Sequence, residues 1–189
     1  SLKANKVFLE EILEQYSDKT ERPNSYNWAR KEAFLSVSEL SATFQRMTQE
    51  PKSQHQHLQS TYELVSLNHT FLSALASMST FIQNHPTTAP SEQFNLAVHN
   101  IKTNLNQSIL AIEQAGNHDE QHLEEKDLSH YLKEEASSTD FIQFSELPIV
   151  EEIKADNPRV YERYLIIEQL KWLFSLSQEI YKKINQMAE

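Results

Sequence analysis

The sequence predicts an all-α protein, an up-and-down helical bundle of four to five long helices with an acidic, partly ordered insertion. Three observations lead to this fold class. Apolar residues recur at spacings of three and four along nearly every long segment, which is the period of an amphipathic helix. Gly116 is the only glycine in 189 residues, whereas strands joined by tight turns usually need several. Prolines fall between the periodic segments, where helices end.

The first two helices are predicted near residues 3–17 and 24–50. The first is short and amphipathic, with its apolar stripe at Val7, Phe8, Ile12, Leu13 and Tyr16. Thr20 and Pro23 then interrupt the pattern. The second helix carries a bundle seam in alternating steps of three and four, at Ala33, Val37, Leu40, Phe44 and Met47. Pro51 ends it, because proline cannot continue a helix.

The third and fourth helices are predicted near residues 53–84 and 91–115. Ser53 followed by Gln56 makes a capping box for the third, whose seam runs through Leu64, Leu67, Phe71, Ala74, Met78 and Phe81. The fourth follows the turn at Asn84 to Pro90 and buries Phe94, Val98, Ile101, Leu105, Ile109 and Ile112. Short connections favour antiparallel packing of these helices.

An acidic excursion over residues 117–157 separates the fourth helix from the last, which is predicted near residues 158–187. Asn157 and Pro158 form a strong helix start, with Asn as the cap and Pro in the first turn. The chain begins and ends inside helical patterns, so residues 1–189 are expected to be a single helical domain cut from a larger protein.

Composition excludes several classes of function. Cysteine is absent, so the chain has no disulfide, thiolate metal site or cysteine nucleophile. The net charge of -10 repels nucleic-acid backbones, so nucleic acid is not an expected partner. The longest stretch without a charged residue, 64–91, is too polar to cross a membrane.

Residues 30–51 carry a pattern of their own on the second predicted helix. Arg30, Glu39, Arg46, Glu50 and Pro51 occur there, with Arg46-Met-x-x-Glu50-Pro51 closing the helix. This pattern resembles the cytosolic helix beside the membrane in the fusaric acid resistance family, bacterial inner-membrane proteins grouped with aromatic acid exporters. From the residues alone, the alternating charges also suit surface ion pairs. Arg30 falls on the apolar stripe, where a guanidinium beside a core needs a carboxylate partner.

The resemblance implies a cytosolic helical domain, at the cytoplasmic face of the bacterial inner membrane, with an assembly or regulatory role and no catalysis. Its expected partner is the membrane-embedded remainder of the same chain, with a homo-oligomer as a further expectation. Efflux of small, often aromatic, organic acids would belong to the parent protein. Lys3, Lys6, Lys182 and Lys183 near the two ends are candidates to face anionic lipid. A soluble interaction module, whose full gene encodes no membrane helix, is the alternative.

Histidines suggest two further hypotheses. His118 and His122 stand four residues apart as in zinc metalloproteases, but aspartate replaces the catalytic glutamate, so a solvated loop is preferred and no metal site is predicted. His99 and Lys102 resemble the core of histidine phosphotransfer domains, in which an exposed helical histidine accepts phosphate. Thr103 stands where that family has glycine. The simpler interpretation is a surface histidine beside Val98 and Ile101.

No enzyme is predicted, because neither a nucleophile elbow nor a glycine-rich phosphate loop occurs. Paired acids such as Glu124 and Glu125 are typical of a solvated face, and no cofactor is expected. Aromatic residues of the last helix could line a pocket for a small organic acid ligand, but core packing is the commoner use of Tyr161, Tyr164, Trp172, Phe174 and Tyr181.

Overall fold

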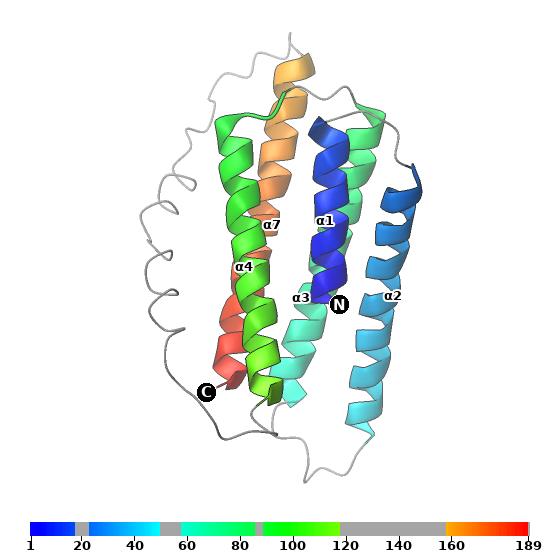
Figure 1. Ribbon diagram of the computed structural model, residues 1–189, viewed down its shortest axis with the longest axis vertical. Coiled ribbons are helices and arrows are strands. Elements are labelled where there is room, and N and C mark those ends of the chain that lie inside the picture. The colour runs from blue at the N-terminus through cyan, green and yellow to red at the C-terminus, as the bar shows by residue number, and fades with distance from the viewer. Residues whose placement is uncertain (18–22, 50–57, 86–88, 118–157, 189) are drawn as a thin grey trace.

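Helices run along a common long axis in the computed structural model, which describes residues 1–17, 23–49, 58–85, 89–117 and 158–188. They are α1 (Leu2–Ser17), α2 (Pro23–Thr48), α3 (Leu58–Asn84), α4 (Glu92–Asn117) and α7 (Pro158–Ala188). No strand occurs in these ranges. The predicted all-α bundle is confirmed (Figure 1).

The helix ends follow local chemistry. Pro158 opens α7 where the sequence places a helix start, and Pro23 opens α2 in the same way. Ser91 caps α4, since its hydroxyl accepts a hydrogen bond from the backbone N–H of Phe94 at 3.1 Å. The capping box predicted at Ser53 lies outside the described residues, as does the acidic excursion predicted over residues 117–157, except Asn117, which ends α4.

The helices α1 to α4 alternate in direction, whereas α7 runs in the same direction as α4 (Figure 1). Two contacts agree with this arrangement. Asn104, at the middle of α4, bonds Ser177, which is just past the middle of α7. Glu63, near the start of α3, pairs with Lys183 near the end of α7, as antiparallel neighbours do. The chain between α4 and α7 must therefore connect opposite ends of the bundle, a distance of about 40 Å for helices of this length.

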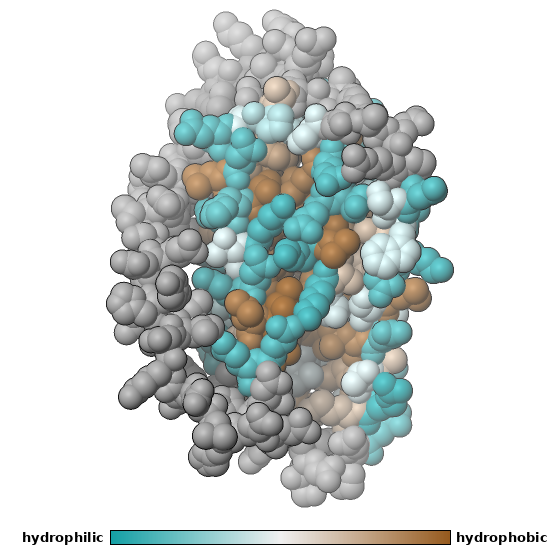
Figure 2. Space-filling view, viewed as in Figure 1, coloured by the Kyte–Doolittle hydropathy of each residue, from teal (hydrophilic) through white to brown (hydrophobic). Residues whose placement is uncertain are grey.

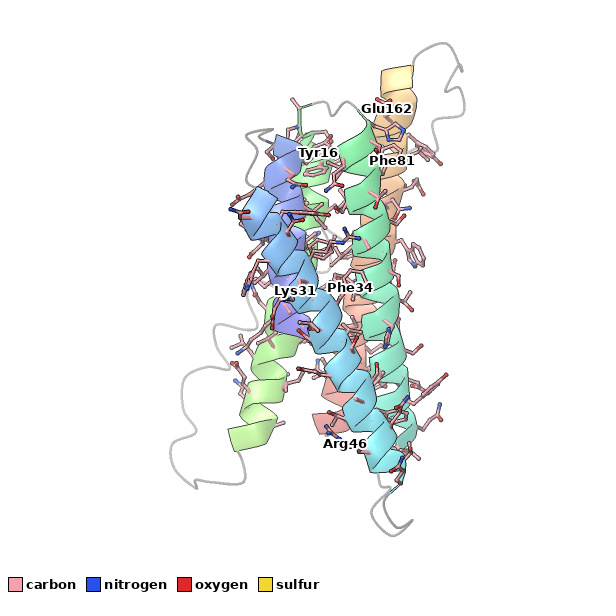
Figure 3. The ribbon with its side chains drawn as sticks, turned by 90° about the vertical axis from the view of Figure 1, so that its right-hand side faces the viewer. Tyr16, Lys31, Phe34, Arg46, Phe81 and Glu162 are labelled. Carbon is pink, nitrogen blue, oxygen red and sulfur yellow. The ribbon has the colours of Figure 1, made fainter. Side chains whose placement is uncertain are left out.

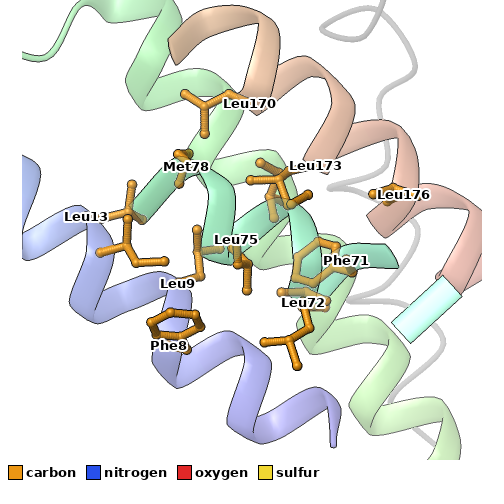
Figure 4. Close-up of a cluster of buried hydrophobic side chains, with 14 of the residues drawn as sticks. Phe8, Leu9, Leu13, Phe71, Leu72, Leu75, Met78, Leu170, Leu173 and Leu176 are labelled. Atoms are coloured by element: carbon orange, nitrogen blue, oxygen red, sulfur yellow. The ribbon is translucent and has the colours of Figure 1, made fainter. Parts of the chain in front are cut away.

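One apolar core joins all five helices. Phe8, Leu9 and Ile12 of α1 meet Phe71, Leu75 and Met78 of α3, and Leu170 and Leu173 of α7 close the cluster (Figure 4). Burying a side chain of this size contributes about 1.5–3 kcal/mol. Most of the apolar stripes predicted for the helices form the core, but Leu40, Phe44 and Met47 of α2 are only half-buried, and Val7 of α1 and Ile112 of α4 are exposed.

The helices differ in how many neighbours they have. The most extensive contact is between α4 and α7, followed by α3 with α7. Helix α1 lies among α2, α3 and α4, whereas α2 packs on α1 and α3 and leaves its outer side exposed (Figure 3). Figure 2 shows apolar side chains in the seam between the mainly hydrophilic outer surfaces of α1 and α4.

Candidate functional site

The described residues of the pattern that resembles the membrane-protein family lie at exposed positions of α2. Arg30, Glu39 and Arg46 are all exposed, while Glu50 and Pro51 lie outside the described residues. Arg46 donates a hydrogen bond to the hydroxyl of Thr43 at 3.0 Å. The three described residues are exposed on one helix but do not share a face, since Arg30 and Glu39 are nine residues apart and point to opposite sides of α2.

The prediction that Arg30 lies beside the core is wrong. Its guanidinium is exposed and sits 5.8 Å from the centre of the Phe34 ring. Ala29 and Ala33 occupy the buried positions at this level, so Arg30 falls at the edge of the stripe, where its long side chain reaches water. An exposed cation–π contact of this kind is worth about 0.5–1 kcal/mol.

A cleft of about 340 Å³ lies between α1 and α2. Ala4, Val7, Trp28 and Ala29 are its apolar lining, and its polar lining is Ser1, Lys3, Glu32 and Ser36. The Lys3 amine lies 2.5 Å from a carboxylate oxygen of Glu113, so its charge is already matched by an acid of α4. The cleft therefore offers an apolar surface without a net positive charge for an anionic ligand.

Two buried polar side chains that the sequence patterns did not single out lie on α1 and α4. Asn5 and Ser108 are fully buried, and neither side chain has a hydrogen-bond partner in the described part of the chain. The ion pairs Lys3–Glu113 and Lys102–Glu10 bracket them, which puts Asn5 and Ser108 at about the same level of the antiparallel pair. Asn5 precedes Ile12 by seven residues, so its position on the apolar stripe, and hence its burial, could have been predicted from the sequence.

Other buried polar groups are paired. Ser177 of α7 donates to the Phe174 carbonyl at 2.7 Å and accepts from the Asn104 amide at 2.9 Å. The Asn68 amide donates to the Leu64 carbonyl at 3.0 Å. The hydroxyls of Tyr26 and Ser79 share a buried hydrogen bond between α2 and α3. The two bonds that join helices, Asn104–Ser177 and Tyr26–Ser79, fix how neighbouring helices are aligned, since each would be lost if the helices slid.

Two of the four lysines expected to face lipid, Lys3 and Lys183, form ion pairs within the bundle. Lys183 lies 2.5 Å from Glu63, and Gln59 also donates to that carboxylate at 2.8 Å. The hydrogen bond from Lys183, with a smaller contribution from Gln59, lowers the pKa of Glu63 from its ordinary value. Lys3 is paired with Glu113. Two of the four lysines thus have acidic partners that offset their attraction to a membrane surface.

The structure places His99 on the exposed side of α4, beside the buried Ile101 and the half-buried Val98. Lys102, three residues further along, lies 3.6 Å from Glu10 of α1. This lysine would have to leave Glu10 to offset the charge of a phosphorylated His99. His118 and His122 lie outside the described residues, within which no group of three or more potential metal ligands is found.

The aromatic residues of α7 do not share one lining. Trp172 is half exposed, whereas Phe174, two residues later, is 5% exposed and packs in the core. Residues two apart on a helix point in diverging directions, so these two rings cannot face one ligand. Core packing accounts for Phe174, and the side chain of Tyr161 is outside what the structure describes.

None of the helices that the structure describes is long and apolar enough to cross a lipid bilayer. Comparison with known proteins nevertheless links part of the chain to a membrane protein. Over 75 residues, 40% of this chain, it is 33% identical to the inner membrane protein YccS of Escherichia coli (strain K12). The matched stretch is 10% of the length of that protein. No family model matches the chain, and no solved structure matches it significantly.

Proposed function

We propose that this chain is a helical domain of a bacterial inner-membrane protein that resembles fusaric acid resistance and aromatic acid efflux transporters. The observation that carries the proposal is the 33% identity to an inner membrane protein over 75 residues. The chain's own pattern from Arg30 to Pro51 supports the same family. In such a protein this domain lies outside the bilayer, at its cytoplasmic face, and contributes to assembly or regulation.

Two features of the bundle favour assembly or regulation over catalysis. Its polar groups in the core align helices, as Ser177 and Asn104 do, and Lys3 of the α1–α2 cleft is already engaged by Glu113 of α4. The edge helix α2 exposes large apolar side chains that can meet another protein surface. Transport of organic acids would then be the work of membrane helices elsewhere in the parent protein.

The proposal is tested by locating the domain in the gene product that carries it. Residues 1–189 contain no cysteine, so once any cysteine elsewhere in the gene product is replaced by serine, one cysteine introduced at the exposed Ser175 serves as a reporter. The gene product is expected in the inner-membrane fraction. A membrane-impermeant maleimide should label the cysteine in inside-out vesicles and leave it unlabelled in intact spheroplasts. A cysteine at the buried Ser108 is the matched control and should stay unlabelled in both.

Other outcomes separate the alternatives. A gene product found only in the soluble fraction would contradict the proposal and favour a soluble interaction module. Labelling of Ser175→Cys in intact spheroplasts would place the domain on the opposite face. Phosphotransfer is checked with acetyl phosphate and mass spectrometry, and we expect His99 to stay unmodified because Glu10 engages Lys102.

A further inference from the structure

The outer side of α2 carries a stripe that the core does not use. We define the outer stripe of α2 as Trp28, Lys31, Leu35, Glu39 and Ala42, all of which are exposed. They are spaced by three and four residues, so they share one face of the helix, opposite Ala29, Ala33 and Val37 in the core. Figure 3 looks onto this edge helix, which lies in front of α1 and α3.

Two large apolar side chains anchor the stripe. Trp28 is 61% exposed and Leu35 is 48% exposed, one heptad apart on the same face. Single exposed apolar residues are normal on a protein surface. Here Ala42 continues the heptad, and charged residues of opposite sign flank Leu35, with Lys31 before it and Glu39 after it. This is the order of residues found along a helix-pairing seam.

The stripe is complementary to itself when read in the opposite direction. In an antiparallel pair of α2 helices centred on Leu35, Lys31 of each copy faces Glu39 of the other. The bulky Trp28 faces the small Ala42, and Leu35 faces Leu35 on the two-fold axis. We propose that two copies of this chain associate through the outer stripe of α2 in this antiparallel register. A two-fold interface requires a patch that matches itself, and this one matches in size and in charge.

A parallel pairing does not offer the same match. It would set Lys31 against Lys31 and Glu39 against Glu39, and like charges that face each other oppose association. The antiparallel register converts the same four charges into two attractive pairs. Because the stripe is a single helix face, the interface is small, so the separate chain should pair weakly. Two copies held side by side in a larger assembly would pair far more completely, through their high effective concentration.

Sedimentation equilibrium of the purified chain from about 1 µM to about 1 mM tests the association. We expect a reversible monomer–dimer equilibrium in this range. Leu35→Glu should abolish the dimer, because two carboxylates would then meet on the axis. Trp28→Ala should weaken it at least roughly tenfold by removing the large anchors. Trp172→Ala on α7 removes an equally exposed tryptophan and should leave the equilibrium unchanged.

The register is tested by reversing charges. Lys31→Glu and Glu39→Lys should each weaken the dimer roughly tenfold, since each exchanges two attractive pairs for two repulsive ones. The double variant restores opposite charges across the interface and should recover the dimer. A monomer throughout the concentration range, or a dimer that survives Leu35→Glu, overturns the proposal. Failure of the double variant to recover overturns the antiparallel register. Helix content by circular dichroism confirms that each variant folds. Since no membrane is present, these results do not bear on the inner-membrane proposal.

Discussion

The buried polar groups of α4 and its neighbours differ in whether they are hydrogen-bonded. Towards α7, helix α4 buries Ile101 and Leu105 against Leu170 and Leu173, and the polar pair Asn104–Ser177 is hydrogen-bonded. Ser108, one turn further along α4, and Asn5 of the neighbouring α1 are also buried, but neither has a partner within the described residues. A buried polar group without a partner costs about 1–3 kcal/mol. The hydrogen-bonded pair Asn104–Ser177 therefore avoids a cost that the unpartnered Asn5 and Ser108 impose on the fold.

The largest expected effect comes from the apolar seam. Leu105→Ala removes a fully buried side chain of α4 and should lower the free energy of unfolding by about 2–5 kcal/mol. Urea denaturation followed by circular dichroism measures this change. Leu110→Ala on the exposed side of the same helix is the matched control and should change stability by less than about 0.5 kcal/mol. Equal effects of both variants would mean that α7 does not cover α4 as described.

The next effect should have the opposite sign. Asn5→Leu removes two unpartnered polar atoms from the buried side of α1 and adds apolar burial, so it should raise the free energy of unfolding by about 1–3 kcal/mol. Asn68→Leu is the control, because the Asn68 amide is paired with the Leu64 carbonyl. No gain is expected there. A loss of stability in Asn5→Leu, in the same urea assay, would show that Asn5 does have a partner.

A pair of serines sharpens the comparison within one experiment. Ser108→Ala should stabilise the protein by about 1 kcal/mol, because the hydroxyl of Ser108 is buried without a partner. Ser177→Ala should destabilise it by about the same amount, since the Asn104 amide loses its acceptor. Thermal unfolding of both variants reports the two signs. If the two changes in stability have the same sign, Ser108 and Ser177 do not differ in hydrogen bonding as described.

The smallest effect concerns the ion pair between α3 and α7. Lys183 lowers the pKa of Glu63 below its ordinary value of 4.5, so this carboxylate stabilises the fold above that pH. The contribution is lost as the pH falls below that value and through the lowered pKa of the folded state. Glu63→Gln should therefore be slightly less stable than the unchanged protein near neutral pH and equal to it in acid. A stability difference that does not change between these two pH values would rule out this linkage.

Much of the bundle could be predicted because helical periodicity is a local signal. The apolar stripes on either side of Ile12 and Phe71 became core, and Pro158 opened the last helix as expected. The direction of α7 could not be predicted, since residues 117–157 are long enough to reach either end of the bundle. Alternating direction was expected from short connections, and it holds for α1 to α4.

The family-like residues show a different limit. Sequence spacing placed Arg30 on the apolar stripe, but Ala29 takes the buried position, so a shift of one residue moves the charge into water. Which residues of an edge helix are buried depends on the positions of its two neighbouring helices. Those positions cannot be predicted from the sequence of the edge helix alone. That Asn5 lacks a hydrogen-bond partner could not be predicted for the same reason, because it depends on which side chains the neighbouring helices place around it.

The parallel course of α4 and α7 also sets an order of events during synthesis. Leu105 leaves the ribosome about 70 residues before Leu173, which at roughly 5–20 residues per second is a delay of about 4–14 seconds. During that interval the apolar face of α4 has no α7 to cover it. The nascent chain therefore exposes the α4 side of the most extensive contact among the described helices until α7 is made, which makes this surface a natural target for chaperones.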